Sequence, residues 1–193
     1  MGLISVWLFA YVFPALAAGM YSKLSPENRE GRKRDIIVMH AALAFSTLAS
    51  QYFIYHYHLP FMSHFEPSSL AIFLIAAAIT YAALGKVGLA YAFSALLQQA
   101  AMLSIAFLLL TQYPLLVVIF LIVPAFVFCH PLFVDDARVR ITLFAFWGTG
   151  SIVLFSLTYD FWLIAAAHTL LGATLISRGL LYSSSFVQTK PPQ

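Results

Sequence analysis

The chain has 193 residues, of which 62% are hydrophobic and only 9% are charged, and its formal net charge is +3. Ordinary soluble domains carry about 25% charged residues, so this composition excludes a soluble globule, a disordered chain and a nucleic-acid-binding module. The one cysteine, Cys129, has no partner for an internal disulfide and fits no metal or redox spacing.

Apolar runs of membrane-spanning length follow one another along the chain. A helix needs about 17–25 mainly apolar residues to cross the hydrocarbon core, and such runs cover residues 3–21, 36–55, 68–85, 88–110, 114–134, 141–157 and 161–182. Proline, glycine and short polar residues mark most of the breaks between them. We therefore predict an all-α, polytopic integral membrane bundle of about seven transmembrane helices. Residues 1–182 form a single transmembrane domain, and residues 183–193 form a polar cytoplasmic tail.

The basic residues predict how these helices are oriented. Loops on the cytoplasmic side of a membrane carry an excess of Lys and Arg. Strict alternation of seven helices puts all ten basic residues on one side and none on the other. They are Lys23, Arg29, Arg32, Lys33, Arg34, Lys86, Arg138, Arg140, Arg178 and Lys190. This asymmetry predicts an N-terminus outside the membrane and a C-terminus in the cytoplasm.

Few polar side chains fall within the predicted helices, and hydrocarbon penalises polar groups that have no partner. Gln98 and Gln99 lie near the middle of the predicted helix 88–110, whereas His130 and His168 lie in 114–134 and 161–182. We expect these four residues to converge in one polar pocket, where they satisfy one another and trapped water. Each of them also fits a simpler role in holding helices together.

The spacing of these residues carries further information. Phe126-Val127-Phe128-Cys129-His130 has the pattern F-x-x-x-H, and His168 follows His130 by 38 residues. This order and spacing resemble the CPBP family of intramembrane proteases, the group that includes the CAAX prenyl endopeptidases, over roughly residues 88–182. Members of that family carry E-E-x-x-x-R, F-x-x-x-H and H-x-x-x-N/D on successive helices. The resemblance implies that the glutamines, His130 and His168 occupy the positions of the protease active site.

The chain departs from that family at the residues that carry the reaction. Gln98 and Gln99 stand where the family has its two glutamates, Leu103 stands at the arginine, and Gly172 stands at the final N/D position. An amide cannot accept a proton near neutral pH, and loss of a general base typically lowers a rate about 10²–10⁴-fold. We therefore interpret the chain as a pseudoprotease that binds a hydrophobic peptide or lipid, or scaffolds a membrane assembly. Whether it is an enzyme is left open by the sequence, with the missing glutamate base arguing against one.

A second group of polar residues follows the second predicted helix. His56, His58, His64 and Glu66 lie within eleven residues on the outer side, and their side chains are ligands for Zn²⁺ or Cu²⁺. The alternative is an interfacial loop whose aromatic residues anchor at the lipid headgroups.

Other functions fit the sequence as well. His40 and His130 lie at similar predicted depths and are the alternative pair of axial ligands for haem in an accessory or cofactor-binding subunit of a larger membrane complex. On the main interpretation no cofactor is expected. The expected partners are membrane lipid and, as alternatives, other membrane subunits or a hydrophobic peptide, with no nucleic acid. A transporter ranks lowest, because ion transporters usually keep an ionisable residue at mid-depth and the predicted helices have none.

Overall fold

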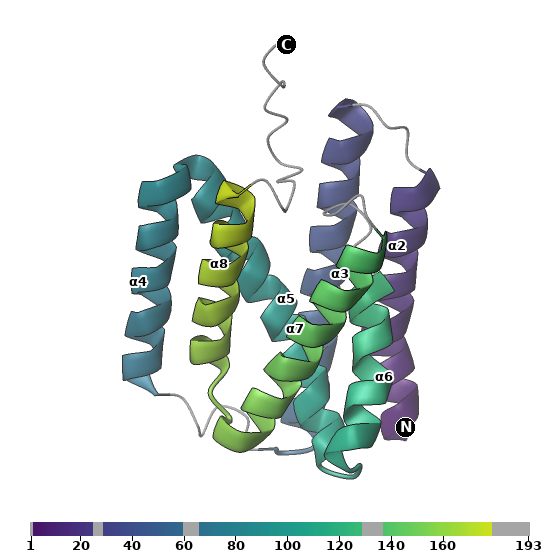
Figure 1. The fold of residues 1–193 in the computed structure, drawn as a ribbon. Coiled ribbons are helices and arrows are strands. Elements are labelled where there is room, and N and C mark those ends of the chain that lie inside the picture. The colour runs from purple at the N-terminus through teal and green to yellow at the C-terminus, as the bar shows by residue number, and fades with distance from the viewer. Residues whose placement is uncertain (1, 25–28, 60–65, 129–136, 179–193) are drawn as a thin grey trace.

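The computed structural model describes residues 2–24, 29–59, 66–128 and 137–178. In these residues helices are the only regular structure, and they form seven rods (Figure 1). The first rod consists of α1 (Leu3–Trp7), the π-helical turn η1 (Leu8–Val12) and α2 (Phe13–Leu24). The others are α3 (Arg29–His56), α4 (Pro67–Leu84), α5 (Lys86–Leu110), α6 (Leu115–Phe128), α7 (Ala137–Thr158) and α8 (Phe161–Ser177).

Five of the described rods are long and apolar enough to cross a membrane. The qualifying segments are Leu3–Tyr21, Arg34–His56, Pro67–Leu84, Lys86–Leu110 and Ile141–Thr158. The helices α6 and α8 are apolar too but shorter, with 14 and 17 residues. The described chain is therefore an all-helical bundle with several helices of membrane-spanning length, as an integral membrane protein has.

The rods begin and end close to where turn chemistry predicts, with differences at three helix ends. The helix expected over 141–157 begins earlier, at Ala137. The helix expected over 36–55 begins at Arg29, because helical hydrogen bonding continues through charged residues that a search for apolar runs leaves out. The helix expected over 161–182 ends at Ser177 with Arg178 as its C-cap. The expected helix 114–134 is described only to Phe128, and the predicted tail over 183–193 lies outside the described residues.

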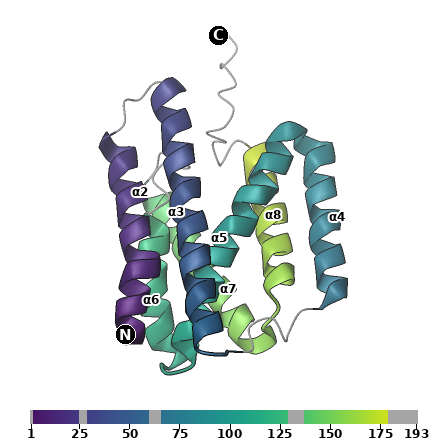
Figure 2. The same cartoon turned by 180° about the vertical axis from the view of Figure 1, so that it is seen from behind.

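Each rod runs opposite to the one before it in the chain (Figures 1 and 2). As a result α2 ends, α3 begins, α4 turns into α5, α7 begins and α8 ends at one end of the bundle, which we call the basic end. Arg34, Lys86, Arg138 and Arg178 belong to the helix ends that meet there. The opposite end holds the starts of α1, α4, α6 and α8.

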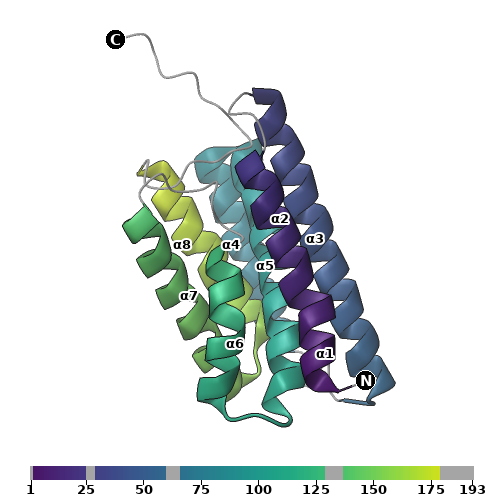
Figure 3. The same cartoon turned by 90° about the vertical axis from the view of Figure 1, so that its right-hand side faces the viewer.

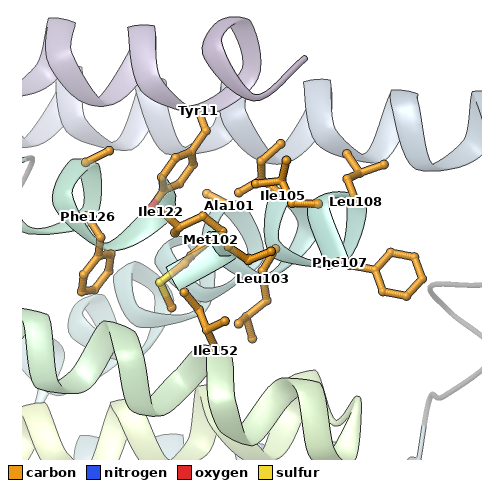
Figure 4. Packing of buried hydrophobic residues seen from close by; sticks show 14 of the residues in the cluster. Tyr11, Ala101, Met102, Leu103, Ile105, Phe107, Leu108, Ile122, Phe126 and Ile152 are labelled. Atoms are coloured by element: carbon orange, nitrogen blue, oxygen red, sulfur yellow. The ribbon is translucent and has the colours of Figure 1, made fainter. Parts of the chain in front are cut away.

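The helix α5 lies at the centre of the bundle. It contacts the first rod and α3, α4, α6, α7 and α8, and Figure 3 shows it between α4 and the pair α2 and α6. Every residue from Ala101 to Leu109 is buried, which is the property of a helix that is apolar all round and enclosed by others. Side chains of the first rod, α6 and α7, including Tyr11, Ile122 and Ile152, pack against this stretch (Figure 4).

Two close contacts fix the neighbours of α5. Gly85 has φ +61°, a backbone conformation that favours glycine, and it turns the chain sharply from α4 into α5. One turn later, a Cβ on Gly88 would lie 2.1 Å from the backbone oxygen of Thr80. The two helices therefore approach each other as closely as their backbones permit at this point.

Candidate functional site

The polar centre of the bundle joins α5 to α8. Gln99 is 0% exposed and His168 is 4% exposed, and the side-chain nitrogen Nε2 of Gln99 lies 2.8 Å from Nδ1 of His168. An amide nitrogen can only donate, so Gln99 donates this hydrogen bond and Nδ1 accepts it. A neutral imidazole has one acceptor nitrogen; the bond occupies it and leaves the ring proton on Nε2.

Aromatic side chains from two other helices enclose the imidazole. The Trp147 ring of α7 lies 5.2 Å from the His168 ring between centroids, at an interplanar angle of 46°. The Tyr91 ring of α5 lies 6.2 Å away and meets the imidazole edge-on at 85°. His168 is thus held by an amide on one side and by two large rings on the others, which fixes both its orientation and its tautomer.

A pocket opens beside these rings, between α5, α7 and α8. Its cavity volume is about 20 Å³, room for about one water molecule, and its lining includes Tyr91, Leu143, Trp147, His168, Gly172 and Leu175. None of the described residues that line it is charged. From their meeting point at the opposite end, α7 and α8 diverge toward the basic end, with α5 behind the gap (Figure 1). The pocket lies in this diverging region, since its lining residues come from the halves of the helices nearer the basic end.

Gly172 has a steric role in this pocket. A Cβ built on Gly172 would lie 1.7 Å from the hydroxyl oxygen of Tyr91, so Tyr91 reaches across to α8 through the space that the missing side chain leaves. Position 172 is where the resemblance to CPBP proteases would require an asparagine or aspartate. Tyr91 occupies the space that such a side chain would need.

Two polar atoms near the imidazole are buried without a hydrogen-bond partner among the described residues. They are Oε1 of Gln99 and Nε1 of Trp147. Buried polar atoms are usually paired with protein or ordered water. Both atoms are shielded from solvent, so a partner for either would have to lie inside the bundle, as an ordered water molecule can.

The remaining members of the predicted pocket are placed only in part. Gln98 is buried, with 5% exposed, on the same turn of α5 as Gln99. His130 lies outside the described residues. The structure therefore brings Gln99 and His168 together, and the convergence of all four residues stays a prediction.

The haem alternative depends on His40, and its ring is already occupied in α3. Nδ1 lies 2.7 Å from the carbonyl oxygen of Ile36, and Nε2 lies 2.6 Å from the hydroxyl oxygen of Ser94 in α5. Because the carbonyl can only accept, Nδ1 carries the proton and Nε2 accepts from Ser94. Iron coordination by Nε2 would require this bond between helices to be given up.

The predicted metal ligands surround the connection from α3 to α4. His56 ends α3 and stacks on Tyr52 with 6.0 Å between ring centroids. His58 is exposed and has φ +53°, and Glu66 is the exposed N-cap residue of α4. His64 lies outside the described residues. Among those that are described, no group of three or more potential ligands gathers in a metal-binding arrangement, so this site stays a prediction that needs His64.

The aromatic walls of the pocket, Tyr91 and Trp147, are functional candidates that sequence reasoning missed. Tyr and Trp within membrane helices are expected at the lipid headgroups, so neither residue was predicted to line a pocket. For Tyr91, helical spacing could have indicated its place. Tyr91 lies seven residues before Gln98, and His168 lies four before Gly172, so each pair shares one face of its helix.

Comparison of the chain with models of known protein families, with curated proteins and with solved structures finds no match. The functional argument therefore depends on the site itself.

Proposed function

We propose that the chain is an integral membrane protein in which all seven rods span the bilayer, with the N-terminus outside and the C-terminus cytoplasmic. The gathering of basic helix ends at one end of the bundle supports this orientation, because cytoplasmic loops are enriched in Lys and Arg. The short helices α6 and α8 are about 21 and 26 Å long at 1.5 Å per residue. Each lies in the same bundle as helices that are long enough to cross.

Labelling of single cysteines tests this topology. With Cys129 replaced by serine, a cysteine at position 30 should be protected from a membrane-impermeant maleimide in intact cells, and a cysteine at position 64 should react. Permeabilised cells, in which both positions should react, provide the control. The reverse pattern in intact cells would refute the orientation.

We propose further that the pocket between α5, α7 and α8 binds a lipid chain without cleaving it. The observation that supports this most directly is an uncharged, mainly apolar lining with a buried polar pair behind it. Ligand pockets typically combine apolar walls with a few placed polar groups.

The narrowness of the pocket favours a lipid chain over a peptide. Its cavity volume of about 20 Å³ is room for about one water molecule, so a ligand would have to part the side chains that line it. A helical peptide is about 10–12 Å across with its side chains, so it could lie against the bundle but not enter. A single alkyl or isoprenyl chain is narrower and would displace these side chains less.

Photolabelling with a diazirine-bearing alkyl chain tests the binding. Peptide mass spectrometry of the labelled protein should locate the adduct on pocket residues of α7 and α8. Leu175→Trp, which adds a large ring to the lining, should abolish this adduct. Leu170→Trp is the matched control, because Leu170 is on the same helix but 39% exposed and outside the lining. Equal labelling of the two variants would refute the proposed pocket.

The proposed relationship to CPBP proteases adds that the chain is a pseudoprotease. The described lining of the pocket holds no carboxylate, and a histidine that has no orienting carboxylate is a poor general base. The natural chain should therefore leave a prenylated or transmembrane peptide intact. Cleavage by the natural chain is compared with cleavage by the Gln98→Glu, Gln99→Glu double variant. Turnover by the natural chain that His130→Ala abolishes would refute the assignment.

A further inference from the structure

Two basic residues end neighbouring helices at nearly the same depth of the basic end. Lys86 is the first residue of α5, and Arg178 is the C-cap residue of α8, which runs in the opposite direction. The close approach of the Tyr91 hydroxyl to Gly172 sets the level at which these helices meet. Lys86 is five residues and Arg178 six residues from that level, about 7.5 and 9 Å toward the basic end at 1.5 Å per residue. The end of α8 accordingly lies beside the turn from α4 to α5 in Figures 1 and 2.

The helices around these two cations provide no counter-charge. The sequences of α4, α5 and α8 contain no Asp or Glu. The acidic residues that flank them, Glu66 and Asp160, are the N-caps of α4 and α8 and lie at the opposite end of the bundle. Lys86 and Arg178 are both exposed, so an anion from outside the protein can reach them.

The position of Lys86 is unfavourable for its own helix. The N-terminus of a helix is the positive end of its dipole, where a cation is destabilising, whereas the C-terminus of α8 favours Arg178. Gly85, the N-cap residue of α5, has no side chain that could cap the first turn, so the N–H groups there add to the positive potential. An anion bound at this point would offset a charge that α5 itself does not favour.

Exposed apolar side chains lie next to this charged corner on its membrane side. Leu89 is three residues from Lys86, on the same face of α5, and is 54% exposed; Tyr81, in the last turn of α4, is 51% exposed. Two cations with apolar side chains deeper in the membrane match a molecule that has an anionic head and hydrocarbon chains. A free anion would use only the first of these two features.

We infer that Lys86 and Arg178 bind the phosphate of an anionic phospholipid at the turn from α4 to α5. On the proposed topology they lie at the cytoplasmic headgroups, where anionic lipids are present and basic sites between membrane helices bind their head groups. Lysine meets a phosphate as a point charge, and arginine as a planar fork of donors. This inference rests on the proposed bilayer-spanning helices and is independent of the pocket between α5, α7 and α8.

Native mass spectrometry of the purified full-length protein in a neutral detergent tests this site. The anionic lipid dioleoyl phosphatidylglycerol and the zwitterionic lipid dioleoyl phosphatidylcholine are titrated separately, and the dissociation constant of the first bound lipid is measured. One basic residue near an anionic lipid is worth roughly a fivefold change in affinity. Lys86→Gln and Arg178→Gln should therefore each weaken binding of phosphatidylglycerol about fivefold, and Lys86→Arg should retain it. Binding of phosphatidylcholine should be weaker than that of phosphatidylglycerol and should change less than about twofold.

Arg34→Gln is the matched control. Arg34 is an exposed cation of α3, and the bond between His40 and Ser94 puts it at nearly the depth of Lys86, but α5 separates α3 from α8 (Figure 2). This variant should bind phosphatidylglycerol as the natural protein does. An equal loss in Arg34→Gln and Lys86→Gln would indicate diffuse attraction to the whole basic end and would overturn the inference.

Two other results would also overturn it. One is phosphatidylglycerol that binds the natural protein no more tightly than phosphatidylcholine. The other is inorganic phosphate that displaces the lipid at equal concentration, because the site would then serve a free anion. The measurement does not depend on which side of a membrane the basic end faces, so a reversed cysteine-labelling pattern would refute the proposed topology without changing this result.

Discussion

Gly172→Ala should disrupt the pocket, because position 172 has no space for one additional methyl group. The new Cβ would lie 1.7 Å from the hydroxyl oxygen of Tyr91 and 2.1 Å from Cζ of the same ring, whereas ordinary contact begins near 3.4 Å. The Tyr91 ring is stiff, so relief requires the whole ring to move away from α8. That movement would alter its edge-on contact with His168.

Overpacking of this kind typically costs about 1–3 kcal/mol. The appropriate comparison is Gly150→Ala in α7, where a Cβ would meet nothing within 4 Å. At that position alanine removes the backbone-entropy cost of a glycine within a helix and should stabilise the protein by roughly 0.5–1 kcal/mol. The two substitutions add the same methyl group and should therefore have opposite signs.

A double-mutant cycle identifies Tyr91 as the cause. Tyr91→Val removes the ring atoms that the new Cβ would meet, so it should offset much of the effect of Gly172→Ala. A coupling free energy of about 1 kcal/mol or more is expected, within the range of residues in direct contact. Unfolding in mixed micelles, followed by circular dichroism, measures all the variants. The reasoning is wrong if Gly172→Ala behaves like Gly150→Ala, or if its effect adds to that of Tyr91→Val without coupling.

Three further substitutions test the contacts that hold the bundle together. Gly88→Ala should lower the free energy of unfolding by more than about 3 kcal/mol and separate α4 from α5. The added Cβ meets the backbone oxygen of Thr80, and no side-chain rotation can relieve that contact. An unfolding midpoint equal to that of the natural protein would contradict this. His168→Ala should destabilise the protein by about 2–4 kcal/mol, because it leaves a cavity and a buried amide without its partner. Gln99→Leu should cost less, about 1–3 kcal/mol, because leucine fills the space of the amide and only Nδ1 of His168 loses its donor. The order of their unfolding midpoints is decisive. Asp160→Ala removes a carboxylate that accepts hydrogen bonds from the backbone N–H of Leu163 and from the Ser69 hydroxyl. We expect the free energy of unfolding to fall by about 1–2 kcal/mol. Faster amide exchange in the first turn of α8 would confirm that loss of the helix cap is the cause.

Several boundaries of the rods were predictable because they follow from local chemistry. Pro67 and Asp160 mark helix starts and Gly85 marks a turn, whatever the rest of the chain does. The central position of α5 was not predictable in this way. Most of the rods are strongly apolar, so hydropathy cannot distinguish a helix that faces lipid from one, such as α5, that is surrounded by the six other rods. The two adjacent glutamines of α5 were the only hint, since polar side chains in a membrane need protein around them.

The polar residues of the candidate site were predictable from the sequence, because each needs a hydrogen-bond partner of its own. Gln99 and His168 must find partners in hydrocarbon, and so the sequence pointed to them. Tyr91 and Trp147 were harder to place, because their rings pack equally well against lipid, at the headgroups or against another ring. Their place in the pocket depends on how α5 and α7 rotate and tilt, which depends on the packing of the whole bundle.

The hydrogen bond between Gln99 and His168 has a consequence for biosynthesis. The two residues are 69 positions apart, so at about 5–20 residues per second the ribosome needs roughly 3–14 s to deliver the histidine after the glutamine. Throughout that interval α5 carries an amide whose partner does not yet exist. Until α8 arrives, water or another polar group has to take the place of the imidazole. The last described helix therefore completes the core of the protein, and a chain that stops before it would present quality control with an unpaired amide in the bilayer.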